Sequence, residues 1–221
     1  MSKRTFVGVM VVALAVVVMA GGLLASNMGF KLNYQLLQTT AGQSKTGTST
    51  IALPDNRQST VNTAKNLLDD IGLANVTNIQ RFVKSNDGLV QYTGRPLGGS
   101  DFALNAGDGY FLKMKTTVNY IVVGSDNPTL GYVLQQTTAG VSKTGTNFYA
   151  YNYHQTATTA KALLDDIGLA NVTNIQRFVK SNDGLVQYTG RPLGGTDFPL
   201  VPGEAYFLKM KTTVTYTPSH Y

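Results

Sequence analysis

Hydrophobic and polar residues alternate along most of the chain, which is the pattern of strands that bury one face. Short runs rich in aromatic, β-branched and aliphatic residues occur at Phe30–Leu37 and Thr50–Leu53. Two further runs, Val76–Lys84 and Leu89–Thr93, flank Asn86-Asp87-Gly88. Asp and Gly tolerate a positive φ, so this tripeptide predicts a tight turn and the flanking runs predict a β-hairpin.

The alternation resumes after a glycine-rich loop at Gly94–Gly99. Phe102 and Leu104 predict another strand, and the four residues from 105 to 108 predict a turn. A longer strand follows, which should carry Tyr110, Leu112 and Met114 on one face and Phe111, Lys113 and Lys115 on the other. Val118, Tyr120 and Val122 extend the pattern.

One short helix interrupts the strands. Ala64, Leu67, Leu68 and Ile71 recur at helical spacing and form a single apolar stripe, and Gly72 marks its end. Two turns of helix are too few to be stable alone in water, so this helix must lie against a sheet. The predicted fold class is therefore α+β, and mainly β.

Much of the sequence occurs in two copies. Leu67–Gly99 recurs without a change as Leu163–Gly195, and Tyr110–Val118 recurs as Tyr206–Val214. We therefore predict two tandem homologous β-rich repeats, residues 26–126 and 127–221, each with one short helix.

The N-terminus has the pattern of an export signal. Lys3 and Arg4 precede an uncharged run from Phe6 to Ala25. This predicts that residues 1–25 are a cleaved signal peptide, with a retained membrane anchor as the alternative. In both cases the rest of the chain lies outside the cytoplasm, at the cell surface or in the medium. Contact with the membrane would run only through residues 6–25, if they are not cleaved.

The composition excludes several kinds of functional site. The chain has no cysteine, which excludes disulfides, thiolate metal sites and cysteine nucleophiles. A chain that begins after Ala25 keeps 16 of the 18 basic side chains and all 12 acidic ones, a net charge of +4. So mild an excess does not indicate a nucleic-acid-binding protein.

The second repeat resembles a module of large secreted bacterial surface proteins. The resemblance lies in the segments Gly145–His154, Thr159–Leu164, Val172–Phe178, Phe198–Phe207 and Thr217–Tyr221. In order they match a Gly-Thr-Asn-aromatic strand, a Tyr-His turn, a short helix, an Arg-aromatic strand and a Pro-Gly-Glu hairpin. The resemblance implies an extracellular building block without an assigned activity. The first repeat departs from it, because Asn56-Arg57 stands where the Tyr-His pair would be.

No catalytic, cofactor or metal site is predicted, and we expect no enzymatic activity. The adjacent acids Asp69 and Asp70 point about 100° apart on a helix and do not converge. His154 and His220 could meet, but two imidazoles without a third ligand make a poor zinc site, and a structural hydrogen bond is favoured. Asn75 and Asn171 fit the glycan acceptor pattern.

Basic and aromatic residues recur together in both repeats. This patch could bind polysaccharide or another polyanion, or its lysines could simply keep strand edges from pairing with other chains. Its members are Arg81, Tyr92, Arg95, Tyr110 and Lys113 in the first repeat, and Arg177, Tyr188, Arg191, Tyr206 and Lys209 in the second. The neighbouring lysines Lys84 and Lys115 recur as Lys180 and Lys211.

These observations favour an exported structural protein of the cell surface or extracellular matrix. One alternative is a filament subunit whose N-terminal strand, residues 26–38, pairs with a neighbouring copy. Another is a carbohydrate- or polyanion-binding surface module. The expected partners are the protein itself or other cell-surface proteins, and polysaccharide under the last alternative.

Overall fold

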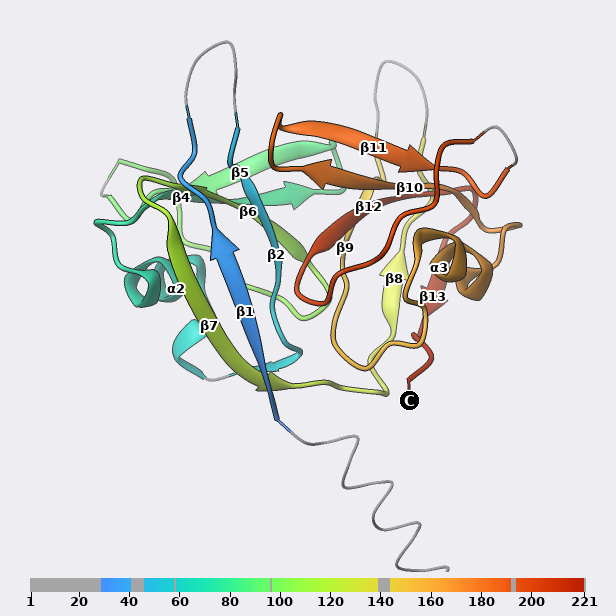
Figure 1. Cartoon of the computed structure of the whole chain (residues 1–221), viewed down its shortest axis with the longest axis horizontal. Coiled ribbons are helices and arrows are strands. Elements are labelled where there is room, and N and C mark those ends of the chain that lie inside the picture. Colours follow the sequence, from blue (N-terminus) through green and yellow to red (C-terminus); the bar gives the residue numbers. More distant parts are fainter. Residues whose placement is uncertain are drawn as a thin grey trace, which may run out of the picture.

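The computed structural model describes residues 29–40, 46–57, 59–95, 97–138, 144–191 and 194–220. This part of the chain is mainly β, with several antiparallel sheets and two α-helices, as the sequence predicts (Figure 1). The predicted signal or anchor segment, residues 1–25, lies outside the described residues. Within them, neither helix is long and apolar enough to span a bilayer.

Each half of the chain forms one four-stranded antiparallel sheet with the same strand order. In the first half the order is β2-β6-β4-β5, with β2 at Ser49–Ala52, β6 at Gly109–Met114, β4 at Val76–Val83 and β5 at Gly88–Tyr92. In the second half it is β9-β12-β10-β11, with β9 at Asn147–Ala150, β12 at Ala205–Met210, β10 at Val172–Val179 and β11 at Gly184–Tyr188. The predicted hairpin is confirmed, and Asp87 takes a φ of 47° at its turn.

A smaller sheet accompanies each four-stranded one. β1, Phe30–Leu36, pairs along its whole length with β7, Val118–Ser125, and β3, Asn56–Arg57, lies on the other side of β7. A 3₁₀ turn, η1, follows at Ser59–Val61. The second half has only a two-stranded counterpart, formed by β8, Tyr132–Leu134, and β13, Val214–Tyr216.

The two helices occupy equivalent places in the two halves. α2 spans Ala64–Ile71 and α3 spans Ala160–Ile167, which confirms the predicted helix. Each helix begins at a threonine whose hydroxyl accepts from the backbone of the first turn, Thr63 in α2 and Thr159 in α3. Such a cap satisfies one of the amide groups that a helix start leaves without a partner.

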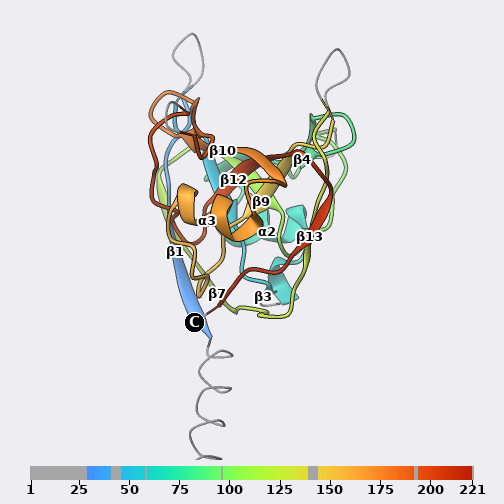
Figure 2. The same cartoon turned by 90° about the vertical axis from the view of Figure 1, so that its right-hand side faces the viewer.

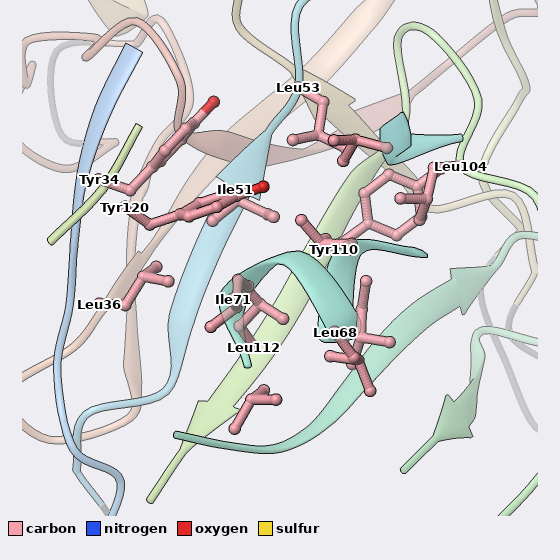
Figure 3. Close-up of a cluster of buried hydrophobic side chains, with 14 of the residues drawn as sticks. Tyr34, Leu36, Ile51, Leu53, Leu68, Ile71, Leu104, Tyr110, Leu112 and Tyr120 are labelled. Atoms are coloured by element: carbon pink, nitrogen blue, oxygen red, sulfur yellow. The ribbon is translucent and has the colours of Figure 1, made fainter. Parts of the chain in front are cut away.

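The helices cover the outer faces of the sheets. In the first half, Leu67, Leu68 and Ile71 lie in one buried cluster with Leu112 of β6 and Leu36 of β1 (Figure 3). The second half has an equivalent cluster. Figure 2, seen from the end of the second half, shows α3 in front of its sheet. Apolar side chains therefore hold each short helix in place.

One predicted strand does not form. The segment at Phe102–Leu104 makes only an isolated bridge, between Ala103 and Thr63, because its backbone bonds to the start of α2. The sequence places Phe111 on the β6 face that also carries Lys113, opposite the face of Tyr110 and Leu112, and both faces of this strand bury residues. Phe111 is buried, because that face of the sheet meets the other half of the molecule.

Phenylalanines join the two halves. Phe111 of β6 stacks on Phe148 of β9 at 4.7 Å between ring centroids, and Phe148 stacks on Phe207 of β12 at 4.5 Å. Phe82 meets Phe207 edge-on at 5.3 Å, and its counterpart Phe178 meets Phe111 at 5.4 Å. We call this contact region the seam. Rings at these separations bury much apolar area and add a favourable quadrupole contact.

Polar contacts across the seam are reciprocal. The carboxylate of Asp87 at the first hairpin accepts from the hydroxyl and backbone amide of Thr146, at 2.6 and 3.1 Å. Asp183 at the second hairpin accepts from the same groups of Thr48, at 2.7 and 3.2 Å. Two backbone bonds of 2.7 Å, from Gly47 to Lys180 and from Gly145 to Lys84, complete the exchange. The halves thus meet through an approximate two-fold relation, in which each offers the same groups to the other.

Candidate functional site

Each half carries a pocket at the open end of its hairpin. The first-half pocket has a volume of about 330 Å³ and is lined by Thr77, Thr93, Arg95, Leu97, Gly98 and Lys115. The second-half pocket has a volume of about 410 Å³, and its lining includes Thr173, Thr189, Arg191, Gly194 and Lys211. These positions correspond in the repeated sequence. The structure therefore has two copies of the same pocket.

Strand geometry places the lining residues together. Thr77 lies near the start of β4, Thr93 follows the end of β5, and Lys115 follows the end of β6. Because neighbouring strands are antiparallel, these three positions fall at the same end of the sheet. The loop that carries Arg95 closes the pocket from the side.

Glycines let this loop fold back onto the strand. The Thr93 backbone amide donates to the Gly98 carbonyl at 2.9 Å, and the Gly98 amide donates to the Arg95 carbonyl at 2.9 Å. Gly99 has a φ of +94°, and a Cβ there would lie 2.0 Å from the Gln91 carbonyl oxygen. Only glycine fits so close an approach of two backbone segments. The pocket rim is therefore fixed by the sequence Leu97-Gly98-Gly99.

Positive charge dominates both pockets. The guanidinium groups of Arg95 and Arg191 make no hydrogen bond or ion pair with the described residues, so both can bind a ligand. The ammonium groups of Lys115 and Lys211 each donate one bond of 2.5 Å, to the carbonyls of Leu73 and Leu169. None of the residues that line either pocket is acidic. Two cations without a counter-charge favour an anionic ligand.

Hydroxyl and apolar groups complete the lining. Thr77 and Thr93 offer hydroxyls beside Arg95, and Leu97 adds an apolar surface. In the second half, Leu169 and Val172 supply the apolar part. An arginine fork binds carboxylate or phosphate through two parallel hydrogen bonds. Hydroxyls and apolar carbon suit the alternating polar and CH groups of a sugar ring.

The structure divides the basic–aromatic patch that was predicted from the sequence. Only Arg95 and Arg191 lie in the pockets. Arg81 instead lies over the ring of Phe102, 5.0 Å from its centroid, and Arg177 lies over Phe198 at 5.1 Å. These cation–π contacts stabilise the fold. Lys113 and Lys209 are half-buried on β6 and β12 and line neither pocket.

The tyrosines of the predicted patch face inward. Tyr110 and Tyr206 are fully buried, and Tyr188 is 8% exposed. The hydroxyl of Tyr110 accepts from the Asn105 backbone amide at 2.6 Å. Burial raises the pKa of the Tyr110 and Tyr206 hydroxyls well above their usual range. Because Tyr92 is also half-buried, the expected stacking of sugars on tyrosine faces is not supported by this structure.

Sequence reasoning missed the threonines of the pockets. Thr77 and Thr93 read as ordinary strand residues, and only the fold brings them next to Arg95. Lys115 and Lys211, by contrast, were predicted as recurring lysines beside the patch, and they do line the pockets. The useful signal was that Thr77, Thr93, Arg95 and Gly98 all lie within the stretch that the two repeats share unchanged.

A second polar group lies where residues 126 and 127 connect the two halves, near the C-terminal end in Figure 1. We call Asp55, Asp126, Asn152 and His220 the seam cluster. The Asp126 carboxylate lies 2.6 Å from Nδ1 of His220, and Asp55 accepts from the side-chain amide of Asn152 at 2.7 Å. The backbone amide of Asn127 donates to Asp55 at 3.2 Å. Neither ring nitrogen of His220 makes a hydrogen bond to the described residues, so the structural hydrogen bond predicted for this histidine is not observed.

Burial sets the charge of the seam cluster. It raises the pKa of Asp55 to about 7, and a hydrogen bond with Asp126 adds to the effect. Burial likewise raises the pKa of Asp126 and lowers that of His220. All three shifts favour uncharged groups, since a charge loses its hydration when it is buried. Within the described ranges, no three acidic, histidine or cysteine side chains converge as a metal site.

The two glycan acceptor asparagines also have structural partners. The side-chain amide of Asn75 donates to the Ile71 carbonyl at 3.0 Å, and its oxygen accepts from Thr116 at 3.0 Å. Asn171 donates to Ile167 at 3.1 Å and accepts from Thr212 at 3.0 Å. The nitrogen that a glycan would occupy thus stabilises the carbonyl end of a helix in each half.

Comparisons with known proteins leave these sites without a precedent. No family model matches the chain, and no curated protein or solved structure is significantly similar to it.

Proposed function

We propose that this chain is an exported structural protein of the cell surface or extracellular matrix, built from two tandem copies of one β-rich module, and that it has no enzymatic activity. The basic start and apolar run of residues 3–25 support export. The resemblance of the second repeat to modules of large secreted bacterial surface proteins supports the same role.

The observation that carries this proposal is the seam. The chain has no cysteine, yet the phenylalanine contacts and the reciprocal Asp87 and Asp183 bonds join its halves into one body. A protein exposed outside the cell has to resist proteases, which cleave locally unfolded segments. Joining two small cores through a shared apolar region leaves fewer such segments.

Localisation tests the proposal. Cells that express the full chain are treated with an impermeant amine-labelling reagent, and a matched strain expresses the chain without residues 6–25. We expect the full chain to be labelled on intact cells and the truncated chain to be labelled only after lysis. Protection of the full chain in intact cells would contradict export. Specific turnover of a substrate by the purified protein would contradict the structural role.

A second candidate function is the binding of anionic polysaccharide, and the twin pockets favour it. Each pocket places an unpaired arginine and a lysine beside threonine hydroxyls. Titration calorimetry with trigalacturonate, a short uronic-acid oligomer, measures this activity. We expect two equivalent sites per chain, with an affinity that falls as salt is added because the contact is ionic. Absence of binding at low salt would exclude the candidate.

The filament alternative finds less support. β1, which makes up most of the proposed donor segment, pairs with β7 of its own chain over all seven of its residues. Leu32, Tyr34 and Leu36 bury their side chains in the first-half core. Releasing this strand to a neighbouring copy would expose those three side chains. Assembly through residues 26–38 therefore requires a second copy to supply the same strand in exchange.

A further inference from the structure

The two pockets lie at opposite ends of one rigid body, and we propose that the protein cross-links separate chains of a uronic-acid polysaccharide. This inference rests on the proposed binding of anionic polysaccharide by the pockets. It adds that binding is bivalent and that the two sites act on different polymer chains.

The hairpins determine where the pockets lie. In each half, the turn of the hairpin touches the other half, through Asp87 in one case and Asp183 in the other. The pocket lies at the opposite end of the same strands, about 20 Å away for a strand of this length. Because the turns point toward the seam, the open ends point away from it. Figure 1 shows the loops after β5 and β11 at the two ends of the long axis.

The seam keeps the two pockets apart. Backbone hydrogen bonds, carboxylate–threonine bonds and the phenylalanine cluster all cross it, at both sides of the approximate two-fold axis. These contacts hold each half in place, so neither half can turn to bring its pocket beside the other. A short oligomer held in one pocket therefore cannot span to the second, so a second molecule must fill it.

The chemistry of the two pockets is the same. Arg95 and Arg191 each offer a planar fork for a carboxylate, and Lys115 and Lys211 keep unused donors next to it. Carboxylates recur on every residue of a uronic-acid polymer, so any stretch of such a polymer fits either pocket. A protein with two equivalent sites and a polymer with many carboxylates together form a cross-linked network.

The experiment compares binding with cross-linking. Polygalacturonate is mixed with the full chain freed of residues 1–25, in a chelating buffer so that metal ions do not gel the polymer, and light scattering is followed. Two variants each disable one pocket, Arg95→Ala with Lys115→Met, and Arg191→Ala with Lys211→Met. The control Lys65→Ala with Lys161→Ala removes two exposed positive charges outside the pockets.

We expect wild type and the control to raise scattering with polygalacturonate and to leave it unchanged with neutral dextran. Each single-pocket variant should bind one trigalacturonate with an affinity within about twofold of wild type, because the sites are distant and independent. Neither variant should cross-link the polymer. Circular dichroism at increasing temperature verifies that both variants are folded.

The possible failures are distinguishable. If wild type binds two trigalacturonates but does not raise scattering, the cross-linking inference is wrong while the binding proposal stands. If wild type binds none, the binding proposal falls and the inference falls with it. Cross-linking that survives in a single-pocket variant, or binding of single-stranded DNA in preference to the uronate, would also overturn the inference.

Discussion

The aspartates of this chain have different roles, which depend on whether the side chain is buried against another element or exposed to solvent. Asp70 accepts from the hydroxyl of Tyr120 at 2.6 Å and ties α2 to β7. Its neighbour Asp69 faces solvent and pairs with Lys65 one helical turn earlier. Acids near a helix C-terminus are mildly unfavourable. The bond to Tyr120 gives a physical reason for placing one there.

Asp55 makes stability depend on pH. Its pKa is raised to about 7 in the folded protein, well above the usual range of an aspartate, mainly by burial. The folded state therefore binds the proton more tightly, and the stabilisation is complete below about pH 4 and is lost as pH rises through 7. We expect this carboxyl to lower the free energy of unfolding by roughly 2–4 kcal/mol between these limits.

The variant Asp55→Asn tests this dependence. Its amide cannot ionise, so urea unfolding measured from pH 4 to pH 8 should show a flatter profile than wild type, whatever its stability at pH 4. His220 and Asp126 face the same place, and the lowered pKa of His220 acts in the opposite direction on acidification. Asp69→Asn, a change at an exposed acid, should keep the wild-type slope. A slope unchanged in Asp55→Asn would contradict the assignment.

At the scale of elements, each helix depends on its apolar stripe. Leu164 of α3 is fully buried in the second-half core. We expect Leu164→Ala to lower the free energy of unfolding by about 2–5 kcal/mol, because it removes transfer energy and leaves a cavity. Lys161→Ala, on the exposed side of α3, should change it by less than about 0.5 kcal/mol. Thermal denaturation of both variants measures the difference, and similar losses would show that the helix is not held by this stripe.

Local signals predicted the elements well where the signal was strong. The helix with its stripe and final glycine, and the hairpin around Asp87, formed as expected because spacing and turn chemistry fix them. The Phe102–Leu104 strand failed because its backbone partner is the start of a helix rather than another strand. β3 was not predicted, since its two residues carry no periodicity.

The candidate site was less predictable than the fold. The sequence identifies the arginines as recurring charges, but it does not show which of them lie against other side chains. Arg81 lies over the ring of Phe102, whereas Arg95 lines a pocket. Tyrosine is a residue type that often stacks on sugars, but Tyr110 is fully buried in the core. The residues that line a pocket come from several strands and loops. The periodicity of hydrophobic residues shows only which residues share a face of one strand or helix, so it does not predict a pocket.

At the scale of the molecule, the seam determines how the protein unfolds. Phe207 contacts Phe82, Phe111 and Phe148 and is 8% exposed. We expect Phe207→Ala to cost about 3–5 kcal/mol. Wild type should unfold in one transition, because the shared cluster couples the halves.

Removing both central rings should uncouple them. In Phe111→Ala with Phe207→Ala, we expect urea unfolding to separate into two transitions. Fluorescence and circular dichroism should then no longer coincide. One coincident transition in this variant would mean that the remaining contacts across the seam are enough to couple the halves.

The carboxylate contacts contribute equally from both sides. We expect Asp87→Ala and Asp183→Ala each to lower the free energy of unfolding by about 1–3 kcal/mol, because each leaves a part-buried threonine hydroxyl and amide without an acceptor. Chemical denaturation of the two single variants and the double variant measures additivity. Losses that differ several-fold between the two singles would contradict the two-fold relation.

The reciprocity of the seam has a consequence for inheritance. Two long unchanged stretches in one gene invite recombination, which deletes the segment between them and leaves a chain with a single module. Such a product keeps both sides of one contact, since it retains Thr48 together with one copy of the hairpin aspartate, the two groups that now pair as Thr48 and Asp183. It can therefore meet a second copy of itself in the way the two halves now meet. Loss of a repeat would turn a fused pair into a homodimer, and the fold would survive the deletion.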